Sequence, residues 1–112
     1  MIEKTVLGHL SRCLEVKCYM ERQPSAVLPF VLVEKTGSSR NNYLDGATFA
    51  IQSYGRTMIE AAELNQLVKN AMNHLADSVE VSACHLNSDY NFTDTRTKEY
   101  RYQAVFDISY WD

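Results

Sequence analysis

The sequence predicts an α+β fold in which two helices pack on one face of a single, mainly antiparallel sheet. Apolar residues recur at helical spacing in two segments and alternate with polar residues in the segments between and after them. The predicted order is helix, strand, strand, strand, helix, strand, strand, which is typical of this class. A chain of 112 residues with 46% hydrophobic and 22% charged content is in the range of one globular domain, so we expect residues 1–112 to form a single domain.

The chain opens with a predicted helix over residues 2–13, where apolar residues recur three or four positions apart. They are Ile2, Val6, Leu10 and Cys13. Residues 15–21 follow with strict alternation of apolar and polar side chains, which predicts a strand with one buried face. Proline residues after this segment exclude a central ladder position, so we expect it at an edge of the sheet.

Two further strands are predicted on either side of a polar segment. Residues 30–35 are rich in β-branched and aromatic side chains, and residues 47–54 place Phe49 and Ile51 on one face. The small polar residues at 36–42 favour turn geometry. We therefore expect two antiparallel neighbours joined by a mobile loop.

A second helix is predicted to begin after Thr57. Thr57 and Glu60 fit a capping box, in which the threonine oxygen accepts from the first helical N–H groups and the glutamate reaches back. An apolar stripe follows at helical spacing and predicts packing against the sheet. The stripe consists of Ala61, Leu64, Val68, Ala71 and Leu75. The helix is expected to end near residues 76–77.

The last part of the chain predicts a strand over residues 79–86, a polar loop over 87–98 and a final strand over 100–111. The core face of the final strand consists of Tyr102, Ala104, Phe106, Ile108 and Tyr110. Trp111 lies on the opposite, more polar face, where it either anchors a subunit contact or covers the end of the sheet. Because both helices use one face, the other face is expected to be under-covered.

The charge pattern argues against several partners. Fourteen acidic and 11 basic residues are mixed along the chain and give a net charge of −3, without the basic stripe of a duplex-DNA reader. The chain also lacks a run of about 18 apolar residues that could span a bilayer. We expect a soluble protein that is not exported and does not bind membranes.

No residue pattern indicates an enzyme. Cys13, Cys18 and Cys84 have no CxxC spacing, and Cys84 and His85 are adjacent on a predicted strand, so their side chains point to opposite faces. No glycine-rich phosphate loop, paired carboxylates at helical spacing or histidine cluster is present. We expect no catalytic centre, no metal and no cofactor.

Four segments, residues 30–38, 47–55, 56–64 and 100–108, together resemble the tail terminator (tail completion) proteins of long-tailed bacteriophages and prophages. The resemblance implies a small α+β subunit that forms a ring, with six members expected. Such a ring caps the tail tube protein, ends its polymerisation and joins the tail to a head-side connector or stopper protein. It implies assembly in the host cytoplasm, a place in the virion at the head-tail junction, and DNA passing through the lumen without sequence-specific binding.

Other functions stay open at this stage. Related phage neck and tail-tube subunits have similar sheets. A small ligand-binding or enzymatic α+β domain is a second alternative. A nucleic-acid-binding module is a third, and it would require five basic side chains to converge. They are Lys35, Arg40, Arg96, Lys98 and Arg101.

The predicted loops 36–42 and 87–98 are the expected contact segments, because ring formation needs exposed, complementary patches. Aromatic and arginine side chains are enriched in such patches. The candidate interaction residues are Lys35, Ser38, Arg40, Asn41, Tyr43, Tyr90, Arg96, Lys98 and Trp111.

Overall fold

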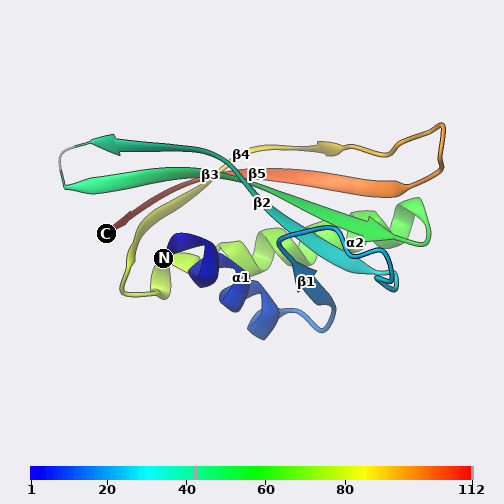
Figure 1. Cartoon of the computed structure of the whole chain (residues 1–112), viewed down its shortest axis with the longest axis horizontal. Helices are drawn as coiled ribbons and strands as arrows, with labels where there is room; N and C mark the ends of the chain where they lie inside the picture. Colours follow the sequence, from blue (N-terminus) through cyan, green and yellow to red (C-terminus); the bar gives the residue numbers. More distant parts are fainter. Residues whose placement is uncertain (42, 112) are drawn as a thin grey trace.

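The computed structural model describes residues 1–41 and 43–111, with the backbone alone described for Asn41. The chain forms two layers, a sheet above and helices below (Figure 1). Its elements are α1 (Ile2–Cys13), β1 (Lys17–Tyr19), β2 (Phe30–Asn41), β3 (Leu44–Gly55), α2 (Met58–Met72), the short 3-10 helix η1 (Leu75–Asp77), β4 (Val81–Asn91) and β5 (Tyr100–Trp111). The predicted α+β class is confirmed.

The five strands are ordered β1-β2-β3-β5-β4. β1 is parallel to β2, and every other neighbouring pair is antiparallel. β3 lies at the centre and pairs along its whole length, from Leu44 to Gly55 with β5 and from Leu44 to Tyr54 with β2. The last strand in the chain, β5, therefore sits inside the sheet between β3 and β4.

The core lies between the helices and one face of the sheet (Figure 1). The predicted apolar faces of both helices and of β5 are confirmed for most of their members, but Cys13, at the end of α1, is exposed. The buried members lie in this core. They include Ile2, Val6 and Leu10 of α1, Leu64, Val68 and Ala71 of α2, and Ala104, Phe106 and Ile108 of β5. Phe49 and Ile51 of β3 face the same core, as their alternation predicts. No helix of the described residues is long and apolar enough to cross a membrane.

The predicted cap of α2 is present. The Thr57 hydroxyl accepts from the Glu60 N–H at 3.1 Å. The Glu60 carboxylate reaches one residue further back than a capping box requires and accepts from the Arg56 N–H at 2.7 Å. Gly55 permits this tight entry, because a Cβ there would lie 2.5 Å from the Ala61 backbone nitrogen.

The predicted mobile loop at 36–42 is wrong over its described part, since β2 continues as a strand to Asn41. The strand pairs with β3 as far as Asn41 and Leu44, with a bulge between Lys35 and Gly37. Small polar residues favour turns locally, but a neighbouring strand that supplies ladder hydrogen bonds overrides this preference. Residue 42 lies outside the described residues.

The predicted boundary between strand and loop at residue 86 is also wrong, because β4 begins at Val81 and extends to Asn91. Bulges between Val81 and Ala83 and between Leu86 and Ser88 shift the alternation. Val79, included in the predicted strand, precedes β4 and is 96% exposed, whereas Cys84 packs against the core. A bulge reverses which side chains face inward, so simple period-two counting fails across it. The edge strand expected at 15–21 is confirmed but shorter, as β1.

Substituting Val68 by Ala should lower the free energy of unfolding by about 1–3 kcal/mol, because Val68 is fully buried between α2 and the sheet. Chemical denaturation monitored by circular dichroism measures this. Leu67→Ala is the matched control, since Leu67 on the same helix is 54% exposed. An equal loss in both variants would contradict the assignment of the buried face.

The pKa of Glu60 should be about 2, because the Arg56 side chain and backbone N–H both donate to its carboxylate. A lowered carboxyl pKa favours the folded state above pH 4.5 and loses this contribution as the pH falls toward 2. NMR titration of the Glu60 side-chain carbon measures the value. In Arg56→Gln the pKa should move up toward 4.5, and an unchanged value would contradict the role of the guanidinium.

Candidate interaction surfaces

The β2–β3 hairpin and the end of β5 extend beyond the helical layer (Figure 1). This follows from geometry, because twelve-residue strands span about 40 Å at 3.3 Å per residue, whereas the fifteen residues of α2 span about 22 Å. The whole domain is correspondingly long, 44 × 24 × 24 Å. We call this projecting region the hairpin end; it consists of residues 38–41, 43–47 and 109–111.

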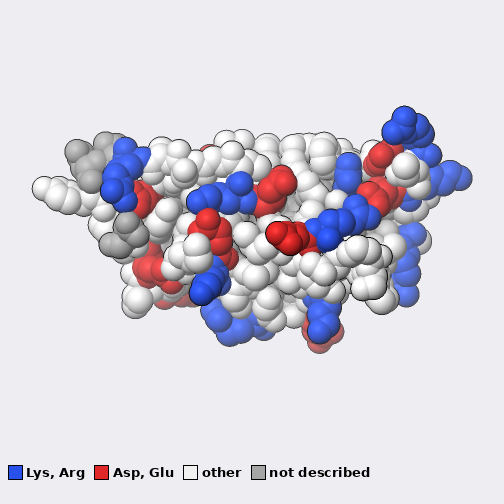
Figure 2. Space-filling model, in the orientation of Figure 1, with Lys and Arg blue, Asp and Glu red and all other residues white. Residues whose placement is uncertain are grey.

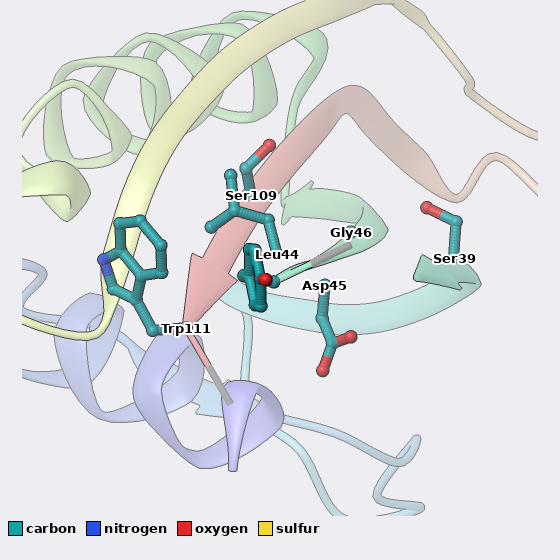
Figure 3. A pocket seen from close by; sticks show the side chains of 7 residues that line it. Ser39, Leu44, Asp45, Gly46, Ser109 and Trp111 are labelled. Atoms are coloured by element: carbon teal, nitrogen blue, oxygen red, sulfur yellow. The ribbon is translucent and has the colours of Figure 1, made fainter. Parts of the chain in front are cut away.

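The hairpin end carries a hollow of about 540 Å³ on the side of the sheet away from the helices (Figure 3). Leu44 and Trp111 are cross-strand partners, and the Trp111 backbone N–H donates to the Glu80 carbonyl at 2.8 Å. Trp111 is 50% exposed and Tyr43 is 92% exposed. An exposed tryptophan and tyrosine beside a hollow are typical of a protein contact site.

Small residues leave this hollow open. Ser39 pairs with Gly46, and Gly46 pairs with Ser109 on the next strand, so a glycine and two serines stand in one row across the sheet. A Cβ at Gly46 would lie 2.5 Å from the Ser39 hydroxyl oxygen. Figure 3 shows Leu44 between this row and the Trp111 ring. The Leu44 and Trp111 side chains therefore lie beside a hollow that the neighbouring small residues do not fill.

The helix-facing side of the hairpin end is polar. The Arg40 guanidinium donates to both Asp45 carboxylate oxygens, at 2.7 and 3.1 Å, and this hydrogen bonding lowers the pKa of Asp45. Lys35 forms an ion pair with Glu3 of α1 at 2.9 Å. A second hollow of about 360 Å³ is lined here by Lys35, Ser38, Ser39, Arg40, Asp45 and Tyr110. The two sides of one hairpin thus differ in chemistry.

The opposite end of the sheet is formed by the β4–β5 connection, residues 92–99. The Asp94 carboxylate accepts from the backbone N–H groups of Arg96 and Thr97 at 3.0 and 3.3 Å, and Lys98 has a positive φ of 58°. The Arg96 and Lys98 side chains are exposed. Figure 2 shows basic side chains gathered at this end. The upper edge of the molecule in that view, where the sheet lies, is mostly uncharged; we call this edge the rim formed by the sheet.

Arginine side chains that lie over aromatic rings connect this basic end to the sheet. Arg101 lies 4.5 Å from the Phe92 ring centre, and Arg22 lies 5.0 Å from that of Tyr54. Glu99 pairs with both arginines, and hydrogen bonding from Arg22 is the main cause of its lowered pKa. Sequence analysis missed this cluster, because Arg22 and Glu99 are 77 residues apart and no local spacing connects them.

Tyr90 belongs to a polar network on the open face of the sheet. The Tyr54 hydroxyl donates to Gln52 at 2.8 Å, Gln52 donates to Gln103 at 2.8 Å, and Gln103 donates to the Tyr90 hydroxyl. Both glutamines are buried. The Tyr90 hydroxyl therefore accepts a hydrogen bond from a buried glutamine, while part of the Tyr90 ring is exposed.

Most of the predicted interaction residues fall into two groups at opposite ends of the domain. The hairpin end has Ser38, Arg40, Tyr43 and Trp111, and the basic end has Tyr90, Arg96 and Lys98. Lys35 lies between the two ends, in the middle of β2. Asn41 is in β2 at the hairpin end, and its side chain lies outside the described residues. Leu44 and Gly46 precede the strand predicted at 47–54 and Ser39 lies in the predicted loop, so the local pattern does not indicate the row of small residues beside Leu44.

The five basic residues of a nucleic-acid site do not converge. Arg40 is at the hairpin end, about 30 Å along the strands from the connection that carries Arg96 and Lys98, and Lys35, in the middle of β2, is about 20 Å from it. Arg101 donates to the Phe92 carbonyl at 2.7 Å. Within residues 1–41 and 43–111, no three His, Cys, Asp or Glu side chains come together in a way that could hold a metal ion.

No protein-family model matches the chain, and no curated protein sequence matches it. Among solved structures, it is similar to a chain of the virion of a native gene transfer agent (GTA) particle, with a TM-score of 0.48 and 10% sequence identity. The similarity covers 96% of this chain and 84% of that chain. At this level the similarity supports no statement about function, so the proposal below rests on the residues of the chain itself.

A thiol reagent at pH 8 should modify Cys13 first, because Cys13 is exposed, while burial raises the pKa of Cys84 to about 11 and also raises that of Cys18. Intact-mass analysis after brief alkylation should show a single adduct. Cys13→Ser should show none over the same time. Early modification of Cys84 in that variant would contradict its burial against the core.

Proposed function

We propose that this chain is a structural subunit of a phage-like virion, a tail terminator that forms a ring, with six members expected, at the end of the tail tube. The observation that carries the proposal is the pair of chemically different ends on one long domain. One is aromatic and hollowed, around Tyr43, Leu44 and Trp111, and the other is basic, around Arg96 and Lys98.

A terminator must contact two different neighbours along the particle axis, the tube on one side and the connector or stopper on the other. Two separated surfaces of different chemistry meet this requirement, whereas a closed dimer would use one self-complementary patch. The sequence resemblance of the segments 30–38, 47–55, 56–64 and 100–108 to tail terminators supports the same function.

The charge distribution is consistent with a ring that DNA traverses. The rim formed by the sheet is mostly uncharged, and the chain is net negative. Each lysine or arginine contact to phosphate strengthens DNA binding, so a surface with few of them lets DNA pass without being held. We propose no catalytic centre and no cofactor for this function, and a place in the virion at the head-tail junction.

Mixing the purified protein with isolated tail tubes of its own particle should give rings at one tube end and no further tube growth. Trp111→Ser together with Tyr43→Ser should reduce tube binding at least about tenfold while leaving the unfolding midpoint nearly unchanged, because both side chains are exposed. Negative-stain microscopy and co-sedimentation measure binding, and circular dichroism measures stability.

Val27→Ser is the control, since Val27 is exposed but lies in the β1–β2 connection, away from the hairpin end. Arg96→Ala with Lys98→Ala should retain tube binding if the hairpin end faces the tube, and should impair joining to the connector. A protein that stays monomeric at high concentration and also fails to bind tubes would refute the proposal.

A further inference from the structure

Both edges of the sheet are open over long stretches. β4 forms one edge and pairs only with β5. At the other edge β1 pairs with β2 only at Phe30, Val31 and Leu32, so among the described residues no strand lies beside residues 33–41 of β2 on the side away from β3. In an antiparallel strand about half of the backbone N–H and C=O groups point away from the partner. Each open edge therefore presents a row of backbone groups that can pair with another strand.

The composition of β4 does little to prevent such pairing. Val81–Asn91 contains no lysine, arginine, proline or glycine, and Asp89 is its single acidic residue. Proteins that keep an edge strand unpaired usually place lysine or proline there. The two bulges of β4 interrupt the ladder and leave regular segments on either side of residue 87. Leu86, between those bulges, is 50% exposed and apolar.

We propose that β4 of one copy pairs with residues 33–41 of β2 in the next copy, so that the sheet continues from subunit to subunit around the ring. This inference rests on the proposed ring function and names the interface that closes the ring. The two edges lie on opposite sides of the sheet, as a head-to-tail contact requires.

Strand direction fits this pairing. β2 runs antiparallel to β3, β3 to β5 and β5 to β4, so β2 and β4 point in opposite directions within one subunit. A rotation axis that runs along the strands preserves each direction. β4 of one copy therefore meets β2 of its neighbour as an antiparallel partner, the arrangement already used across most of this sheet.

The number of edges left open favours this pairing over two β4 strands meeting each other. A β4-to-β4 dimer would leave the edge of β2 over residues 33–41 unpaired in both copies, whereas the β4-to-β2 contact covers both kinds of edge.

Backbone amide hydrogen exchange, read by mass spectrometry, tests the pairing in the full chain. We compare dilute monomer with rings formed at high concentration or on tail tubes. Peptides covering Val81–Asn91 and residues 33–41 should both exchange at least roughly tenfold more slowly in rings, because their edge amides become paired. Peptides from α2 should change little.

Leu86→Lys should raise the concentration at which half of the protein is assembled by roughly tenfold, because it places a charge at the edge that pairs. Val79→Lys is the matched control, since Val79 is also exposed and apolar but precedes β4, and it should assemble normally. Unfolding midpoints of both variants should stay close to that of the parent chain.

The outcomes separate this inference from the proposed function. Rings without slower exchange at either edge would overturn the interface and leave the terminator function standing. A dimer with slower exchange in β4 alone would overturn the β4-to-β2 pairing. A protein that neither assembles nor binds tubes would remove the proposed function and this interface together.

Discussion

The full-length pairing of β3 with β2 on one side and with β5 on the other is the interaction on which the rest of the structure depends. It holds three long strands side by side and presents Phe49 and Ile51 to the helices. Because the helices are only about half as long as these strands, one face of the sheet can be covered over only part of its length. The hairpin end, with its hollow and exposed rings, is the direct result of that mismatch.

The two faces of the sheet are stabilised differently. The helix side is a conventional apolar core, whereas the open side is maintained by stacking of Phe30 on Tyr54, with ring centres 4.6 Å apart, and by the glutamine pair Gln52 and Gln103. Paired amides and stacked rings tolerate water nearby, which a row of leucines would not. This allows the open side to stay ordered in a lone subunit and still meet a neighbour.

Local patterns predicted the parts of the fold that local physics decides. The helix Ile2–Cys13, the cap at Thr57 and the alternating faces of β5 depend on spacing within a few residues, and the structure confirms them. The continuation of β2 through Ser38 and Arg40 depends on a partner strand, so the turn-forming residues there predict a loop where the structure has a strand. The Arg22–Glu99 pair, and the hollow that Gly46 leaves beside Trp111, depend on contacts across most of the chain, which no local pattern encodes.

The position of β5 between β3 and β4 constrains the order of folding. β5 follows every other described element in the chain, yet β4 has no other strand to pair with, so β4 stays without a partner until β5 has been synthesised. Until then, the nascent chain exposes an unpaired strand whose backbone groups can associate with other chains. The sheet is therefore completed by its final segment rather than grown strand by strand, and long-range pairing of this kind makes folding slow relative to helix formation.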